Sequence, residues 1–252
     1  MDSMPPPSPD WCLFLDVDGT LIELAATPFE SVADPEIKAL LVEVGTRLGG
    51  ALALVSGRTI SYLDALLAPL RLPTAGLHGV ERRDAAGVLH GSELADPALD
   101  GARAAFKALV NAHPGTVFED KGRSIAIHYR LAPQYEPRIT EVVSGIAARA
   151  GPHYHLQHGI MMLELKPAGS SKATAIAAFL EEPPFHGRRP VFVGDDLTDH
   201  DGFEIVEARG GISVAVGDRV RAQYRAANVS MVRAWLKDLA ALPPSAQAAP
   251  PR

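Results

Sequence analysis

The sequence predicts an α/β protein whose parallel sheet is interrupted by an inserted α+β domain. Near both ends of the chain, short apolar segments that stop at polar turns alternate with helical patterns, as is typical of a parallel sheet. Between these parts the pattern changes to pairs of short strands and two helices, which indicates an antiparallel α+β domain. We find no internal repeat.

The composition narrows the class of protein. The chain has 252 residues, of which 47% are hydrophobic, so it can bury a full core. A formal net charge of −6 argues against a nucleic-acid partner. No apolar stretch is long enough to span a bilayer, and the first residues lack the basic and apolar regions of a signal peptide. Cys12, the only cysteine, is expected in the core. We therefore predict a cytoplasmic protein without a membrane partner.

The first part of the chain predicts two strand–helix units in succession. Residues 11–15 form an apolar strand, and Asp34-Pro35 begins a helix that Gly49-Gly50 ends. Residues 51–55 form a wholly apolar strand, followed by a helix that contains Leu63 and Leu67. Residues 74–79 contain the end of a third strand.

The middle of the chain predicts the inserted domain. A helix ends at His113-Pro114-Gly115, and strands follow over 116–120 and 124–130. A second helix carries Ile139 and Ile146, and strands over 153–157 and 160–165 complete the domain. In the strand 124–130, Ile125, Ile127 and Tyr129 share one face, while Ser124, Ala126, His128 and Arg130 share the other.

After the insert the strand–helix alternation resumes. Ser170 is expected to cap a helix, residues 190–194 and 211–216 to form strands, and Ser230 to begin the last helix. The predicted organisation is a discontinuous core over 11–83 and 166–242, an insert over 84–165, and flexible tails over 1–10 and 243–252.

Two of the predicted strands end in residues suited to phosphate chemistry. Asp16 and Asp18 follow the first strand and are spaced for a nucleophile and a general acid/base; a solvated turn is the alternative. Ser56-Gly57 follows the second strand, where a hydroxyl and a glycine N–H at a helix N-terminus can bind phosphate oxygens. For Ser56 the alternative is a simple helix cap.

Two later segments carry complementary charges. Lys172 falls in a first helical turn, where the helix dipole disfavours a cation unless an anion lies nearby; an exposed lysine is the alternative. Asp195, Asp196 and Asp199 follow the strand 190–194, and carboxylates so close together repel one another unless a cation joins them. Sparse carboxylate ligation of this kind suits Mg²⁺, and an acidic surface loop is the alternative.

The order of these four segments resembles the haloacid dehalogenase superfamily of phosphotransferases. The resemblance implies a Rossmann-like parallel-sheet core with a C2-type cap, which in that superfamily is inserted between the second and third motifs. A narrower resemblance, to the trehalose-6-phosphate phosphatase family, rests on segments found along nearly the whole chain. They are residues 76–83 (GLHGVERR), 119–121 (EDK), 126–130 (AIHYR), 164–167 (ELKP), 194–199 (GDDLTD) and 202–203 (GF). The chain departs from the family at His200 and Ala173.

The family resemblance implies a role for each site residue. Asp16 is the nucleophile, ionised at neutral pH if its pKa is the ordinary value of about 3.9, and Asp18 is the acid/base. Mg²⁺ is bound by Asp16, the Asp18 carbonyl and Asp195. The remaining implied residues are Asp196 and Asp199 as support for the metal ligands, Ser56, Gly57 and Lys172 for the phosphate, and Arg58, His78, Glu119, Lys121, His128, Arg130 and Glu164 for the substrate, with those of the insert for its sugar.

The implied reaction is hydrolysis of trehalose 6-phosphate through an aspartyl-phosphate, with the insert opening and closing about hinges near Asp84 and Leu165. The sequence leaves alternatives open. They are another capped phosphatase or a phosphomutase that acts on sucrose phosphate, a hexose phosphate or a mannosyl phosphate, a non-catalytic sugar-phosphate sensor, and a partner-binding scaffold. The expected partner is a small sugar phosphate, and a monomer is compatible with the sequence.

Overall fold

The computed structural model describes residues 3–24, 31–91 and 97–243. It divides into two compact units, Met1–His90 with Ser171–Arg252, and Gly91–Ser170. Most of the expected tail over 243–252 lies outside the described residues.

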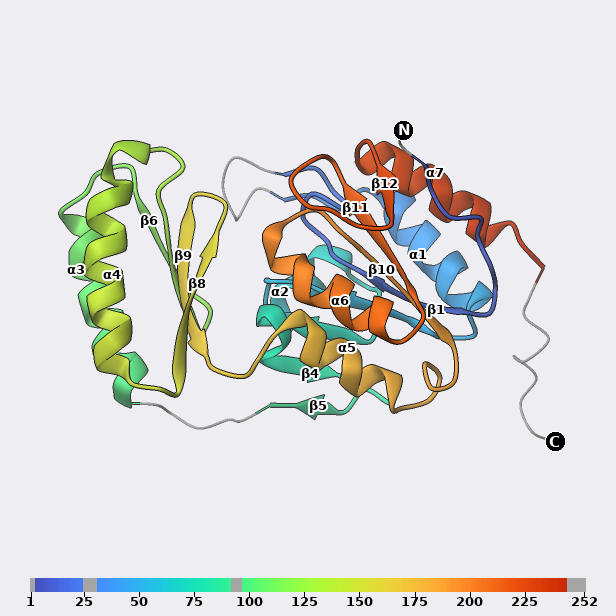
Figure 1. The fold of residues 1–252 in the computed structure, drawn as a ribbon, viewed down its shortest axis with the longest axis horizontal. Helices are drawn as coiled ribbons and strands as arrows, with labels where there is room; N and C mark the ends of the chain where they lie inside the picture. The colour runs from blue at the N-terminus through green and yellow to red at the C-terminus, as the bar shows by residue number, and fades with distance from the viewer. Residues whose placement is uncertain (1–2, 25–30, 92–96, 244–252) are drawn as a thin grey trace. The chain divides into compact units, whose positions relative to one another are not determined.

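The first unit is built on one eight-stranded sheet, with strand order β12-β11-β10-β1-β2-β3-β4-β5 (Figure 1). Neighbouring strands from β12 to β3 are parallel, and β3, β4 and β5 are antiparallel. The strands are β1 (Trp11–Leu15), β2 (Leu52–Val55), β3 (Thr74–Gly76), β4 (Glu81–Arg83), β5 (Leu89–His90), β10 (Arg189–Gly194), β11 (Ile212–Val216) and β12 (Tyr224–Ala226). The parallel core that the sequence predicts is confirmed.

Helices flank this sheet in two groups: α1 packs with α7, and α5 packs with α6. The bounds are α1 (Pro35–Arg47), α2 (Ile60–Leu67), α5 (Lys172–Leu180), α6 (His200–Ala208) and α7 (Val229–Ala240). Because β1 to β2 and β10 to β11 step in opposite directions along the sheet, right-handed crossovers place α1 and α6 on opposite faces. Two short 3₁₀ turns complete the unit, Leu77–Gly79 and Leu197–Asp199.

The strands β1 and β2 are entirely buried, as expected for strands covered on both faces. Phe14 of β1 lies at the centre of the core. Its ring stacks on Phe185 with a centroid distance of 5.5 Å and lies 6.0 Å from Phe179 of α5. This packing fixes β1, and with it the residues that follow β1, relative to α5.

The second unit is a four-stranded antiparallel sheet with two helices on one face (Figure 1). The strand order is β6-β7-β9-β8. Its elements are α3 (Pro97–Asn111), β6 (Val117–Asp120), β7 (Ile125–His128), a 3₁₀ turn (Pro133–Tyr135), α4 (Glu136–Ala150), β8 (Tyr154–Gly159) and β9 (Met162–Pro167). Ile125, Ile127 and Tyr129 join the core beneath the helices, as their alternation predicts.

Several local features differ from the sequence-based expectations. The hairpin β4–β5 and the edge strand β12 are not predicted, because these strands have two or three residues and are largely polar. Ser171 caps α5 in place of Ser170, and Asn228 caps α7 two residues before Ser230.

Part of the segment 3–10, which the sequence assigns to a tail, contacts the core. Ser3 forms a β-bridge with Arg225, and the indole N–H of Trp235 donates to the Pro5 carbonyl at 2.7 Å.

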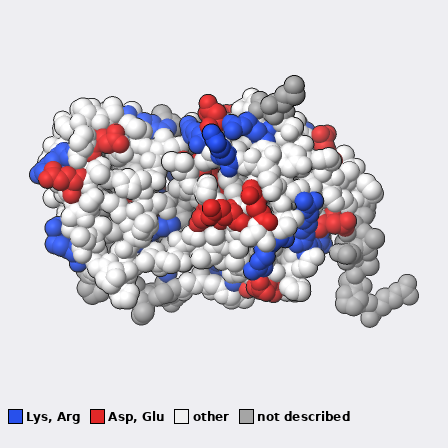
Figure 2. Space-filling model, in the orientation of Figure 1, with Lys and Arg blue, Asp and Glu red and all other residues white. Residues whose placement is uncertain are grey.

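On the face shown in Figure 2, acidic and basic side chains are interspersed, and neither sign covers that face continuously.

Candidate active site

The site lies at the carboxyl edge of the parallel sheet in the first unit. Asp16 directly follows β1, Ser56 follows β2 and Asp195 follows β10, and these three strands are neighbours. Lys172 is the first residue of α5. Because parallel strands end at the same edge, residues far apart in the sequence meet there.

Lys172 joins two of the carboxylates. Its Nζ lies 2.9 Å from Asp16 Oδ1 and 2.5 Å from Asp199 Oδ1. The Lys172 side chain is 2% exposed and that of Asp199 is fully buried. A buried ammonium needs paired anions to offset its lost hydration, so the alternative of an exposed surface lysine is wrong.

Asp199 also organises the loop after β10. Its Oδ2 accepts the backbone N–H groups of Asp195 and Asp196 at 3.0 and 2.9 Å. The Asp199 carboxylate therefore binds both the Lys172 ammonium group and the backbone N–H groups of Asp195 and Asp196. Asp196 is only partly buried, and its own carboxylate accepts the Leu197 N–H at 2.7 Å.

Burial raises the pKa of the carboxyl groups of Asp16, Asp195 and Asp196. It raises the pKa of Asp16 well above the ordinary value, and the attraction of Lys172 only partly opposes this. Burial raises the pKa of Asp195 to about 7, and repulsion by Asp199 adds to the effect. For Lys172, burial lowers the pKa, but Asp16 and Asp199 outweigh it and the pKa is raised. The expectation of an ordinary pKa for Asp16 is therefore wrong for the metal-free protein.

The donor set fits a hard cation. Carboxylate oxygens of Asp16, Asp195 and Asp199 lie within 4.8 Å of one another. A Cβ at Gly19, where φ is +80°, would lie 2.3 Å from Asp195 Oδ2, so the Asp18–Gly19 peptide runs directly beside that carboxylate. Two aspartates and a neighbouring backbone carbonyl are the type of oxygen ligands that Mg²⁺ accepts.

The Asp18 carboxylate belongs to a separate ion pair beside this group. Arg58 Nε and Nη2 donate to its two oxygens at 2.7 and 2.8 Å, and the Ser31 hydroxyl donates to Oδ1 at 2.8 Å. In this structure Arg58, which the resemblance assigns to substrate binding, thus holds the expected acid/base.

The segment after β2 is buried. Ser56 is 1% exposed, and its hydroxyl accepts the Arg58 N–H at 3.2 Å. Helix α2 begins four residues later, with Thr59 as its N-cap. The alternative that Ser56 is a simple helix cap is therefore wrong. His78 is buried beside Gly57, since a Cβ on Gly57 would lie 2.6 Å from His78 Nε2.

In the second unit, the sheet face opposite the helices carries a chain of polar contacts. Glu119 Oε2 lies 2.7 Å from His128 Nε2 and 3.9 Å from Lys121 Nζ. Lys121 Nζ lies 3.1 Å from Glu164 Oε2, and the Ser124 hydroxyl donates to Glu164 Oε1 at 2.5 Å. The structure therefore brings together four of the five residues that the resemblance assigns to the sugar in this unit. Arg130 is exposed just after β7.

Two contacting residues are missed by the sequence reasoning, Ser31 and Arg219, while Ser124 is placed on the correct strand face without a role. Arg219 Nη1 lies 3.1 Å from Asp195 Oδ2. Its position in the loop after β11, the strand beside β10, is a signal that could have identified it.

The two residues at which the chain departs from the family make other contacts. His200 is exposed, 3.6 Å from Glu204, and Ala173 donates its N–H to Asp201 at 3.5 Å. Among the contacts of the described residues, none joins His200 or Ala173 to the carboxylates around Lys172.

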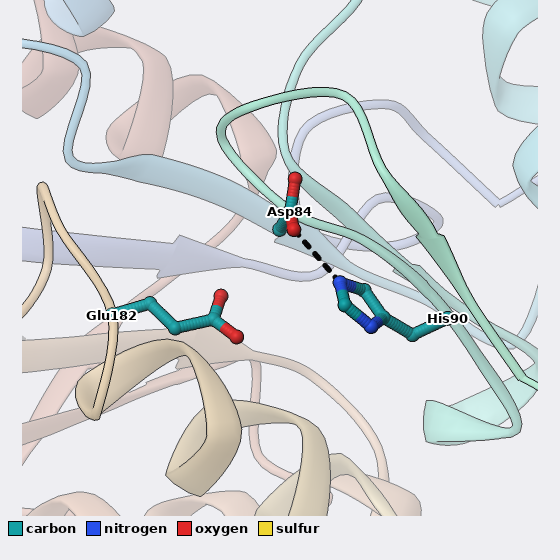
Figure 3. A group of neighbouring side chains, drawn as sticks. All are labelled: Asp84, His90 and Glu182. Carbon is teal, nitrogen blue, oxygen red and sulfur yellow. Dashed lines mark hydrogen bonds and ion pairs between the residues drawn. The ribbon is translucent and has the colours of Figure 1, made fainter.

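A second group of possible metal ligands lies near the hairpin β4–β5: Asp84, His90 and Glu182 (Figure 3). Asp84 Oδ2 lies 2.7 Å from His90 Nε2. Both oxygens of Glu182 accept from Arg82, at 2.7 and 2.8 Å. This guanidinium already neutralises Glu182, so we interpret the group as ion pairing that fastens the hairpin to the end of α5.

Within the described residues, none of the helices has the length and apolarity needed to cross a bilayer.

The fold of the first unit, with the inserted second unit, defines a class of protein, the α/β proteins that share the fold of the haloacid dehalogenase superfamily. A haloalkanoate-superfamily phosphatase from Bacteroides thetaiotaomicron matches with a TM-score of 0.59 at 16% identity, over 88% of this chain and 91% of that chain. This likeness shows the fold alone.

The particular family follows from the sequence comparisons. The trehalose-phosphatase family model matches residues 14–231. A probable trehalose-phosphate phosphatase of Sinorhizobium fredii is 42% identical over 92% of this chain and 88% of its own length. The trehalose-6-phosphate phosphatase of Escherichia coli is 42% identical over 91% of this chain and 86% of its own length. The chain belongs to the trehalose-phosphatase family.

Solved structures agree with this assignment. The crystal structure of a trehalose-6-phosphate phosphatase related protein matches with a TM-score of 0.77 at 25% identity, over 90% of this chain and 96% of that one. The C-terminal domain of the Candida albicans trehalose-6-phosphate phosphatase matches at 0.80, with 19% identity and 92% of each chain covered.

The raised pKa of Asp195 predicts how pH affects the metal-free protein. Folded Asp195, with a pKa of about 7, binds a proton more tightly than unfolded Asp195, whose pKa is about 3.9. The free energy of unfolding should therefore fall as pH rises between these values. Asp195→Asn cannot ionise, so in EDTA at pH 8 its Tm should exceed that of the wild type, by about 2–4 °C per kcal/mol.

The gain in Tm of Asp195→Asn over the wild type should shrink at pH 5, where the Asp195 carboxyl of the folded wild type is protonated. Calorimetry at pH 5 and pH 8 measures the difference in Tm, and Asp238→Asn on the exposed side of α7 is the control. An Asp195→Asn protein that is less stable than the wild type at pH 8 would contradict the assignment.

Proposed function

We propose that this protein hydrolyses trehalose 6-phosphate to trehalose and phosphate. The single observation that carries the proposal is the buried Lys172 between Asp16 and Asp199, beside Asp195, in a member of the trehalose-phosphatase family. Phosphoryl transfer depends mainly on positioning and on charge neutralisation. This arrangement supports both, because it places a potential nucleophile next to a fixed cation and further carboxylates.

In the proposed reaction, an Asp16 carboxylate oxygen forms a bond to phosphorus while the bond from phosphorus to the sugar oxygen breaks. Asp18 gives a proton to that departing oxygen. Asp18 then takes a proton from a water molecule whose oxygen attacks phosphorus, the bond from Asp16 to phosphorus breaks, and phosphate leaves. The two-pronged contact of Arg58 favours the ionised form of Asp18, the form that takes the proton from water. Arg58 therefore has to release at least one Asp18 oxygen before that oxygen can carry the proton for the departing group.

We propose that Asp16, Asp195 and the Asp18 carbonyl hold Mg²⁺, with Asp199 and Asp196 behind them. When bound, the ion supplies charge neutralisation for the phosphoryl oxygens and for the carboxylates. Its binding would also offset the raised pKa values of Asp16 and Asp195, which result first from burial and then from repulsion by neighbouring carboxylates. Ser56, Gly57 and Lys172 are proposed to bind the remaining phosphoryl oxygens.

We propose that the polar face of the second unit binds the sugar. A disaccharide offers many hydroxyls and little apolar surface, so ionised side chains fixed in pairs suit it. Glu119, Lys121, His128 and Glu164 form such a set, and Arg130 is adjacent in sequence. The domain boundaries at 83/84 and 165/166, the hinges near Asp84 and Leu165, and the cytoplasmic location remain predictions.

The nucleophile assignment predicts that Asp16→Asn abolishes turnover. The amide cannot form the phosphoryl bond, although it fills the same space beside Lys172. Phosphate release from trehalose 6-phosphate should fall at least about 10⁴-fold, while circular dichroism and Tm show a folded protein. Asp238→Asn serves as the matched control and should keep full activity. Appreciable hydrolysis by the Asp16 variant would refute the role.

A substrate panel tests the proposed function as a whole. Phosphate release is measured for trehalose 6-phosphate, sucrose phosphate and glucose 6-phosphate, with Mg²⁺ and with EDTA. We expect the highest kcat/KM for trehalose 6-phosphate, no activity in EDTA, and a higher Tm when Mg²⁺ is added. Preference for another ester would indicate a different sugar-phosphate phosphatase, and binding without turnover would indicate a sensor.

The sugar assignment predicts that Lys121→Met separates two substrates. The KM for trehalose 6-phosphate should rise about 10- to 100-fold, since hydrogen bonds to charged groups contribute about 1.5–3 kcal/mol. Hydrolysis of p-nitrophenyl phosphate, which has no sugar, should be unchanged. Lys107→Met on the exposed side of α3 is the control. Equal losses on both substrates would place Lys121 outside sugar recognition.

A further inference from the structure

The turn Leu77–Gly79, between β3 and β4, has an unusual backbone. Leu77, His78 and Gly79 all have positive φ, at 52°, 54° and 97°. Two successive residues with side chains are rarely found in the left-handed region, and such conformations persist only where the surroundings enforce them. Leu77 is fully buried and His78 is 8% exposed, so the surroundings do enforce this one.

The first of these surroundings is the segment 56–58, which carries the proposed phosphate ligands. The N–H of Leu77 donates to the Arg58 carbonyl and that of His78 to the Ser56 carbonyl, both at 2.9 Å. The turn is thus bonded on both sides of Gly57. The His78 ring covers Gly57 itself, because a Cβ there would lie 2.6 Å from Nε2.

Glu81, the second residue after the turn, extends this contact. Glu81 Oε1 accepts the N–H of Ile60, the first residue of α2, at 2.5 Å. A Cβ at Gly76 would lie 2.9 Å from both the Arg58 carbonyl oxygen and the Ile60 nitrogen. Residues 76–78 and Glu81 therefore lie against residues 56–58 and Ile60.

The second segment that contacts the turn is the Ser171 peptide, which precedes Lys172. A Cβ at Gly79 would lie 2.2 Å from the Ser171 carbonyl oxygen, so the Gly79 backbone rests directly on that peptide. The turn consequently touches two segments that are distant in sequence, one leading into Gly57 and the other into Lys172. Nothing in the mechanism above uses this turn.

We propose that the turn Leu77–Gly79 is a spacer that sets the distance between the Ser56-Gly57 segment and Lys172, with His78 as a positioning residue that acts through Gly57. The inference rests on the proposed function, in which those residues bind phosphoryl oxygens. It assigns to His78 a role different from the direct substrate contact that the resemblance implies. The consequence is that the turn controls affinity for the phosphoryl group itself, with or without a sugar.

Gly79→Ala and Gly87→Ala form a matched pair for testing the spacer. Both substitutions put alanine at a left-handed position, with φ of +97° and +85°. At Gly87 nothing lies within 4 Å of the new Cβ, whereas at Gly79 the Cβ collides with the Ser171 carbonyl. The backbone penalty is therefore shared, and only Gly79→Ala displaces the peptide next to Lys172.

The probe is inorganic phosphate, measured as a competitive inhibitor of the Mg²⁺-loaded enzyme and by calorimetric titration. We expect phosphate affinity to fall about 10- to 100-fold in Gly79→Ala, because a misplacement of about 1 Å has effects of that size. In Gly87→Ala it should stay within about twofold of the wild type. Equal phosphate affinity in the two variants overturns the spacer.

His78→Asn tests the positioning residue and covers the case in which Gly79→Ala does not fold. Asparagine tolerates the left-handed region but removes the ring from Gly57. We expect the inhibition constant for phosphate and the KM for trehalose 6-phosphate to rise by the same factor. A rise in KM with unchanged phosphate inhibition would mean that His78 contacts the sugar, and would overturn the proposal. If the wild type binds phosphate but does not hydrolyse trehalose 6-phosphate, the proposed function fails. The spacer proposal is then still tested by comparing the phosphate affinities of Gly79→Ala and Gly87→Ala in the calorimetric titration.

Discussion

The ion pairs of Lys172 are the interaction on which the rest of the site depends. An ammonium group with almost no exposure is tolerable only when carboxylates surround it, and here Asp16 and Asp199 do so from two different strand ends. The same contacts keep the acidic side chains from separating. Since Asp199 also binds the backbone beneath Asp195, a single cation organises the loops after β1 and after β10.

Close approach of backbone segments is the second constraint. Gly19 lets the Asp18–Gly19 peptide reach the Asp195 carboxylate, and Gly57 and Gly79 let the turn after β3 reach its two neighbouring segments. At each of these places a side chain would occupy the space of another group. The glycines therefore let the segment after β1 approach the loop after β10, and let the turn after β3 approach the segments after β2 and before α5.

The two faces of the sheet in the second unit have different roles. The apolar face of β7 is buried under α3 and α4, so it holds the sheet rigid. The opposite face keeps polar side chains in mutual contact, from His128 through Glu119 and Lys121 to Glu164 and Ser124. Side chains already held in this way lose little further freedom when they bind a ligand.

The sequence by itself determined the parallel core, the insert and the residues at the strand ends, because apolar runs of strand length and helical spacing are local patterns that survive folding. It did not reveal β4, β5 or β12, whose few polar residues carry no periodicity. Only the tertiary structure decided that Arg58 pairs with Asp18, that Arg219 reaches Asp195 and that burial raises the pKa of Asp16. Such pairings depend on how separate loops meet in space, and no local pattern encodes that meeting.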